Sequence, residues 1–201
     1  MKLRSLAIRS IASIAAAFTP SVAWAHAGTG AAADFSHGFL HPLTGADHML
    51  AMIAVGILAY QIGGRALWFV PLSFLLFMVV GGTLGATGVD MPHVELGIAL
   101  SVVILGAAIA FGIAAPLLVT MAIVGIFAVF HGHAHGAEMP ASTSALGYAL
   151  GFVSSTALLH LAGIGIGMLI GRIGARHEPA LVRAAGGLMT VAGLGVLGGV
   201  L

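Results

Sequence analysis

The amino-acid sequence predicts an all-α polytopic membrane protein with six transmembrane helices after a cleaved signal peptide. Of its 201 residues, 60% are hydrophobic and only 6% are charged, and the mean hydropathy is +1.13. A water-soluble domain of this size needs more charge on its surface. The 30 glycines suit helices that pack closely in lipid. The chain has no cysteine, which excludes disulfides, thiolate metal sites, iron–sulfur clusters and cysteine nucleophiles.

Residues 1–25 are typical of a secretory signal peptide. Lys2, Arg4 and Arg9 give it a basic start, residues 11–18 form a short apolar core, and residues 23–25 (AWA) fit a cleavage site. The alternative is an uncleaved first transmembrane helix, for which the apolar core is short. After cleavage, residues 26–201 form a single domain that begins at His26. This domain keeps four arginines against six carboxylates, a formal charge of −2.

Residues 27–40 are expected to form an exposed lead-in, and six apolar segments follow it. They span residues 40–61, 66–85, 92–112, 114–131, 143–170 and 180–201, each near the ~20 residues that cross a bilayer. Repeated small residues, such as Gly147 and Gly151 or Gly163 and Gly167, indicate close contacts between helices. Gly186 and Gly187 open a similar glycine-rich stretch in the last segment.

The charged residues predict how the segments are oriented. With the mature N-terminus outside, Arg65, Arg172, Arg176 and Arg183 all fall on the cytoplasmic side, as the positive-inside rule requires. Asp34, Asp90, Glu95 and Glu138 fall on the outer side, and only Glu178 lies among the arginines. We therefore expect a bacterial inner-membrane protein whose mature N-terminus is periplasmic.

Ionisable side chains gather where the first apolar segment begins. Residues 41–48 read HPLTGADH, so His41 and His48 are seven residues apart and share a face if both lie on one helix. Asp47 then points toward a neighbouring helix or orients one of the two imidazoles. Charged and ionisable groups at the mouth of a membrane helix are costly to desolvate and indicate a functional site.

A second group of donors closes the fourth segment. Residues 130–138 read FHGHAHGAE. His131, His135 and Glu138 share one face if the helix continues, and His133 then points away. The alternative is that Gly132 and Gly136 end the helix and a loop turns all three histidines inward.

Two further residues are candidate ligands. Glu95, near the start of the third segment, has two readings, as a first-turn carboxylate that meets the helix dipole or as a metal ligand at the same membrane level. His160 lies deep in the fifth segment. It either relays an ion or hydrogen-bonds a neighbouring backbone or the Thr156 hydroxyl one turn away. Imidazole with carboxylate suits borderline divalent metals such as Ni²⁺, Co²⁺, Zn²⁺ and Cu²⁺.

These two motifs resemble those of the HupE/UreJ family of bacterial nickel and cobalt permeases. Residues 41–48 match the family's HPxxGxDH, and residues 130–138 match its FHGxAxGxE. The resemblance implies that metal selection or passage involves His41, Asp47, His48, His131, His135 and Glu138. The family's glutamate at the start of the third helix matches Glu95, whereas His133 falls at a variable position and receives no role. The larger nickel/cobalt transporter family has one residue fewer between histidine and aspartate, and more spans.

We therefore predict a permease for uptake of Ni²⁺ or Co²⁺, driven by the membrane potential. The sequence has no GxxxxGK[ST] phosphate loop, and we expect neither an enzymatic reaction nor a prosthetic group. The expected partners are a divalent metal ion and the lipid bilayer, with no nucleic acid. The alternatives are an intramembrane metalloenzyme, a haem protein with His48 and His160 as axial ligands, and a metal-sensing membrane protein. Ligand types alone do not separate nickel from cobalt, or a channel from a carrier.

Overall fold

The computed structural model describes residues 30–174 and 178–200, and all regular structure within them is helical. The elements are α2 (Ala31–Leu40), η1 (His41–Leu43), α3 (Ala46–Ile62), α4 (Ala66–Ala86), α5 (Val94–Phe111), α6 (Leu117–Ala137), α7 (Ala145–Gly174) and α8 (Glu178–Leu197). This confirms the predicted all-α membrane fold. The predicted signal peptide, His26 and Arg176 lie outside the described residues.

Five helices, α4 to α8, are long and apolar enough to cross a membrane. The first predicted span, residues 40–61, corresponds to a broken pair: the segment Ala31–Leu43 meets Ala46–Ile62 at a bend of 81°. The single helix expected over residues 40–61 was therefore wrong. Pro42 lies at the start of the 3₁₀ turn η1, and Gly45 has an extended backbone (φ −98°, ψ 121°) that interrupts the helical path.

The lead-in expected at residues 27–40 is largely exposed where it is described, but from Ala31 it forms the helix α2, which packs against α7. Glycines make the contact close, since a Cβ added at Gly38 would overlap the backbone of Tyr148 and one at Gly151 would overlap the carbonyl of Phe35. The Asp34 carboxylate also accepts a hydrogen bond from the Ser144 backbone N–H, at 3.1 Å. Both ends of α2 are thereby held on α7.

Helix α3 lies at the centre of the bundle. Its residues from Ala51 to Ala59 are buried except for the partly buried Ile53. It packs chiefly on α7 and also contacts α5, α4 and α8, while α4 pairs with α6 and α5 pairs with α8. A helix that is apolar and buried all round is typical of the interior of a bundle.

Glycines set the distances between the paired helices, as predicted. A Cβ on Gly163 would overlap the carbonyl of Ile53 in α3, and one on Gly186 would lie 2.5 Å from the backbone nitrogen of Ala110 in α5. Gly147 and Gly167 likewise face Asp34 and Tyr60 closely. Gly187 has no atom within 4 Å of an added Cβ, so the prediction of a close contact was wrong at that position, which faces outward.

Several helix boundaries differ from the prediction, and two of them bear on the site. α6 continues to Ala137 rather than ending near residue 131, because Gly132 and Gly136 serve as contact points with α4 and do not end the helix. α5 begins at Val94, so Pro92 precedes it. His93 takes a left-handed backbone conformation (φ 60°) at this boundary, which turns the chain into the helix.

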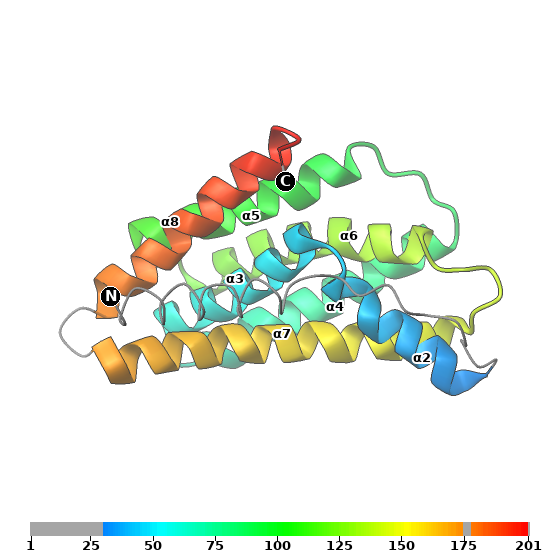
Figure 1. Cartoon of the computed structure of the whole chain (residues 1–201), viewed down its shortest axis with the longest axis horizontal. Helices are drawn as coiled ribbons and strands as arrows, with labels where there is room; N and C mark the ends of the chain where they lie inside the picture. The colour runs from blue at the N-terminus through cyan, green and yellow to red at the C-terminus, as the bar shows by residue number, and fades with distance from the viewer. Residues whose placement is uncertain (1–29, 175–177, 201) are drawn as a thin grey trace, which may run out of the picture.

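The bundle has two chemically different ends. Figure 1 shows α2 and the connections α4–α5 and α6–α7 at one end, and the last turns of α7 with the first turns of α8 at the other. We call the first the histidine end, because it holds His41, His48, His131 and His135. We call the second the arginine end, because Arg172 and Arg183 lie there on α7 and α8. Which end faces the cytoplasm stays a prediction.

Candidate metal-binding site

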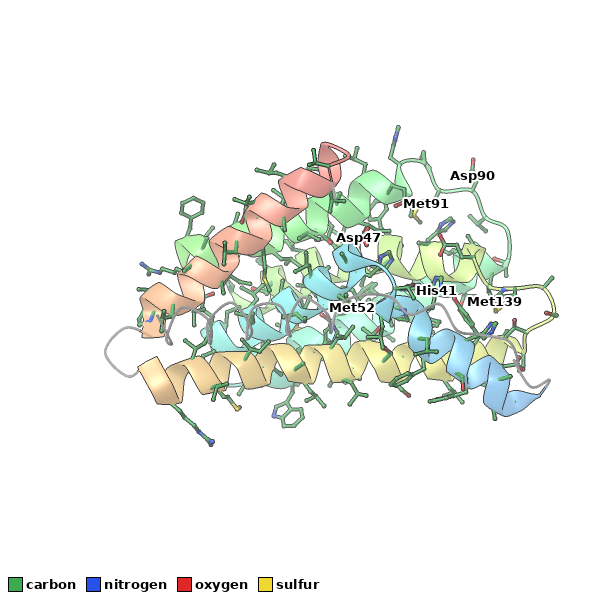
Figure 2. All side chains as sticks on the ribbon, in the orientation of Figure 1. His41, Asp47, Met52, Asp90, Met91 and Met139 are labelled. Atoms are coloured by element: carbon green, nitrogen blue, oxygen red, sulfur yellow. The ribbon has the colours of Figure 1, made fainter. Side chains whose placement is uncertain are left out.

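Four imidazoles from three elements meet at the histidine end. We call them the histidine cluster: His41 of η1, His48 of α3, and His131 and His135 of α6. His135 is in the middle, with ring centroids 4.9 Å from His41 and 4.6 Å from His48. His48 in turn lies 4.9 Å from His131. Figure 2 shows His41 on the side of the bundle that also carries Asp90 and Met139, and Asp47 nearer the middle of the bundle.

The bend before α3 places the first two histidines. Their spacing predicted that His41 and His48 share a helix face. They do not, because the chain turns between them. The turn instead brings both rings onto His135. Gly45 leaves room for these side chains at the turn, since a Cβ there would lie 2.9 Å from Asp47 Oδ1 and 3.1 Å from His48 Nδ1.

The continuation of α6 to Ala137 positions the other two histidines of the cluster. His131 and His135 are one turn apart on one face, and they are 0% and 1% exposed. His133 points away from them and donates its Nε2–H to the carbonyl oxygen of Val89 at 2.7 Å. Of the two predicted alternatives, the structure has the continuous helix and not the loop. Glu138 caps the end of α6 and pairs with His41 Nε2 at 2.8 Å.

Hydrogen bonds fix which nitrogen of His48 carries the free electron pair. Asp47 Oδ1 lies 3.0 Å from His48 Nδ1 and 2.8 Å from the His48 backbone nitrogen. A carboxylate accepts hydrogen bonds, so Nδ1 of the neutral ring carries the proton. The electron pair is then on Nε2, which is buried without a partner among the described residues. Asp47 therefore orients an imidazole, as one of the two alternatives predicted.

Ser101 of α5 likewise determines which ring nitrogen of His131 carries the free electron pair. Its hydroxyl donates to the carbonyl oxygen of Ile98 at 2.6 Å, so its oxygen accepts from His131 Nε2–H at 2.9 Å. The electron pair of His131 is then on the buried Nδ1, and neither nitrogen of His135 has a hydrogen-bond partner in the described chain. An imidazole with one nitrogen held and the other free is the usual arrangement of a metal ligand.

The imidazoles lie beside one another without converging on a single point. Their planes cross at 53° to 88°. Within the residues that the structure describes, no group of three or more histidine, aspartate or glutamate side chains is arranged to hold one metal ion. The cluster thus offers neutral nitrogen donors in sequence along the bundle.

His160 lies beyond the cluster on α7. It is 1% exposed, and neither of its ring nitrogens has a hydrogen-bond partner in the described residues. The predicted hydrogen bond to a neighbouring backbone or to Thr156 is absent there, because the Thr156 hydroxyl donates to Met78 Sδ at 3.6 Å. Phe74 of α4 separates the two levels, with its ring centroid 5.5 Å from His131 and 5.0 Å from His160.

Glu95 is not brought into the cluster. It is exposed in the first turn of α5 and makes no hydrogen bond or ion pair with any described residue. Sequence reasoning had missed Ser101 and Phe74, which contact His131. A lone serine in an apolar helix is a weak signal of a polar partner, and a phenylalanine there gives none.

Comparison with known proteins agrees with the resemblance carried by the two motifs. The family model described as HupE / UreJ protein matches residues 14–196. A curated relative, Protein HupE of Rhizobium leguminosarum bv. viciae, is 44% identical over 186 residues, which cover 92% of this chain and 95% of the relative. No solved structure gives a significant match.

Proposed function

The chain belongs to the HupE/UreJ protein family, and from this premise we propose that it is a permease that carries Ni²⁺ or Co²⁺ across the bacterial inner membrane. The observation that carries the proposal is the histidine cluster. His131 and His135 are buried and His48 is partly buried, and each has a buried ring nitrogen without a partner in the described residues. Neutral imidazole is the ligand that borderline divalent metals prefer when thiolates are absent.

We assign the outermost step to the pair His41–Glu138. Its side chains are 30% and 57% exposed, whereas the other three imidazoles are more deeply buried. A metal ion attracted by the Glu138 carboxylate would meet His41 first and His135 next. Glu95, which is exposed on α5, and Asp47, which holds His48, add negative charge that offsets the charge of the cation. The proposed metal site thus includes His41, Asp47, His48, Glu95, His135 and Glu138.

The ion would be passed between partial sites and not held in a closed cage. The side-by-side rings of the cluster support this, because a site for transport must bind weakly enough to release its ion. His160, whose two nitrogens are buried without partners, is the proposed next ligand. To reach it from His131 the ion must pass Phe74, so movement of that ring belongs to the proposed path.

The membrane potential is a sufficient driving force. A divalent cation that moves inward gains about 4.6 kcal/mol per 100 mV, which corresponds to roughly a thousandfold accumulation. We place the histidine end outside and the arginine end in the cytoplasm, following the positive-inside rule. The proposal includes no catalysed reaction and no prosthetic group.

Metal flux tests the proposal directly. The purified protein in proteoliposomes should take up radioactive ⁶³Ni²⁺ when an inside-negative potential is imposed, and uptake should stop when the potential is collapsed. A metal-sensing protein would bind the ion without flux. Binding without potential-driven uptake of either ⁶³Ni²⁺ or ⁵⁷Co²⁺ would therefore refute transport.

A further inference from the structure

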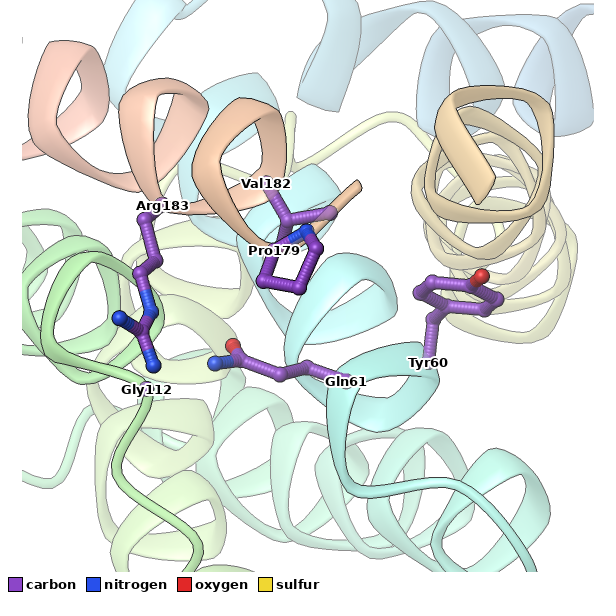
Figure 3. A pocket seen from close by; sticks show the side chains of 6 residues that line it. All are labelled: Tyr60, Gln61, Gly112, Pro179, Val182 and Arg183. Carbon is purple, nitrogen blue, oxygen red and sulfur yellow. The ribbon is translucent and has the colours of Figure 1, made fainter. Parts of the chain in front are cut away.

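A second polar site lies at the arginine end, far from the histidine cluster. From Met49 to Ala59 every residue of α3 is apolar, and Tyr60 and Gln61 are its next polar side chains. Gln61 follows His48 by thirteen residues, about 20 Å along a helix. A cavity of about 470 Å³ opens there between α3, the end of α5 and the start of α8. Figure 3 shows its lining residues: Tyr60, Gln61, Gly112, Pro179, Val182 and Arg183.

The Gln61 side chain lines the cavity, and its amide oxygen is buried beside it. Its Nε2 donates to the carbonyl oxygen of Ile109 at 3.3 Å, which fixes the orientation of the amide. Its Oε1 is buried and has no hydrogen-bond partner among the described residues. A buried acceptor without a partner is unfavourable unless water or a cation reaches it. An amide oxygen is a suitable ligand for either.

Arg183 brings a positive charge to the same cavity. Its guanidinium lies against the backbone where α5 ends, since a Cβ on Gly112 (φ +64°) would be 2.9 Å from one of its terminal nitrogens. The negative end of the α5 dipole favours a cation there. In the described part of the chain both ion pairs are at the histidine end, and none of the described residues that line the cavity is a carboxylate.

We propose that this cavity is the chamber into which the metal ion is released, with Gln61 Oε1 as its last protein ligand and Arg183 as the charge that shortens its stay. This inference rests on the proposed transport function. The cavity is large enough for a hydrated ion, because six waters take up about 180 Å³ of liquid volume. The ion can therefore regain water from the open side while still held by one weak oxygen ligand.

Arg183 makes the chamber a weak site for a cation. A guanidinium beside the amide raises the energy of a divalent cation there. The ion therefore leaves for the cytoplasm quickly, and cytoplasmic metal occupies the chamber poorly. The histidine cluster lies about 20 Å away along α3, so the Arg183 charge acts on it more weakly than on the chamber.

Separate measurements at the two ends test the inference. In proteoliposomes of one orientation, half-saturating ⁶³Ni²⁺ concentrations are measured for flux from each side. Arg183→Gln should lower the value at the arginine end by roughly 3- to 10-fold and change the value at the histidine end by less than about twofold. Arg183→Lys should retain the wild-type value. Gln61→Leu should raise the value at the arginine end, because the oxygen ligand is lost.

Arg172→Gln is the matched control, because Arg172 is an exposed arginine in the last turn of α7 that does not line the cavity. The inference would be overturned if Arg183→Gln left the half-saturating ⁶³Ni²⁺ concentration at the arginine end unchanged, or changed it equally at both ends. It would also be overturned by an effect that disappears in vesicles without anionic lipid, since Arg183 would then be binding a headgroup. Absence of flux in the wild type would instead refute transport itself, which separates the two failures.

Discussion

The two ends of the bundle bury different kinds of polar group. At the histidine end, imidazole rings lie edge to face or tilted against one another, and both nearby carboxylates are hydrogen-bonded to imidazoles. At the arginine end, the polar side chains that line the cavity are Tyr60, the Gln61 amide and the Arg183 guanidinium, and the described lining residues include no carboxylate. The first set of groups attracts and selects a transition-metal cation, and the second holds it weakly. The difference indicates how one bundle can bind at one end and release at the other.

The largest expected effect is the loss of a cluster imidazole. His48→Ala should reduce ⁶³Ni²⁺ uptake at least about 100-fold, because it removes a buried ligand and leaves Asp47 without the ring that it orients. The measurement is initial uptake into proteoliposomes under a fixed potential. His37→Ala is the control, since His37 is exposed on α2 outside the cluster. If the two variants took up ⁶³Ni²⁺ equally, the cluster would have no part in metal binding, and the proposed difference between the two ends of the bundle would be wrong.

The next effect concerns the packing that holds the cluster in place. A Cβ on Gly132 would overlap the carbonyl oxygen of Met78 in α4, so Gly132→Ala must force α4 and α6 apart. Such overpacking costs about 1–3 kcal/mol, and it should lower the unfolding temperature in detergent and weaken uptake. Gly187→Ala is the matched control, because that position is open. If both variants melted at the same temperature, the close α4–α6 contact would not be needed.

A smaller effect is expected from the serine that orients His131. Ser101→Ala removes the acceptor of the Nε2–H and should raise the half-saturating metal concentration at the histidine end roughly 10-fold. The maximal rate should change less, and Ser101→Thr should restore much of the affinity. A variant that lost maximal rate but kept wild-type affinity would show that Ser101 supports the fold and not the ligand.

The smallest effect is expected at the tie between α2 and α7. Asp34→Ala removes the bond to the Ser144 N–H and should lower the free energy of unfolding by about 0.5 kcal/mol, the low end for a hydrogen bond at a solvated site. Uptake should fall by less than about twofold. Ser36→Ala is the comparison, because the Ser36 hydroxyl bonds only to Ala32 within α2. A large loss of uptake in Asp34→Ala would mean that α2 positions His41 more strictly than this contact suggests.

Parts of the site were predictable because they depend on spacing within one segment. The i, i+4 relation of His131 and His135 follows from helix periodicity, and so does the outward direction of His133. The orienting bond from Asp47 to His48 joins adjacent residues. His41 did not follow the same rule, because the turn at Pro42 and Gly45 replaced a continuous helix.

The sequence by itself determined the class of the protein and the chemistry of its donors. High hydropathy and scarce charge require a membrane, and clustered histidines without cysteine favour borderline metals. Only the tertiary structure decided which donors meet and which nitrogen of each is free, because those depend on partners from other helices, such as Ser101 beside His131. It also left Glu95 apart from the cluster and placed Gln61 beside Arg183, since contacts between distant segments are set by helix packing and not by spacing along the chain.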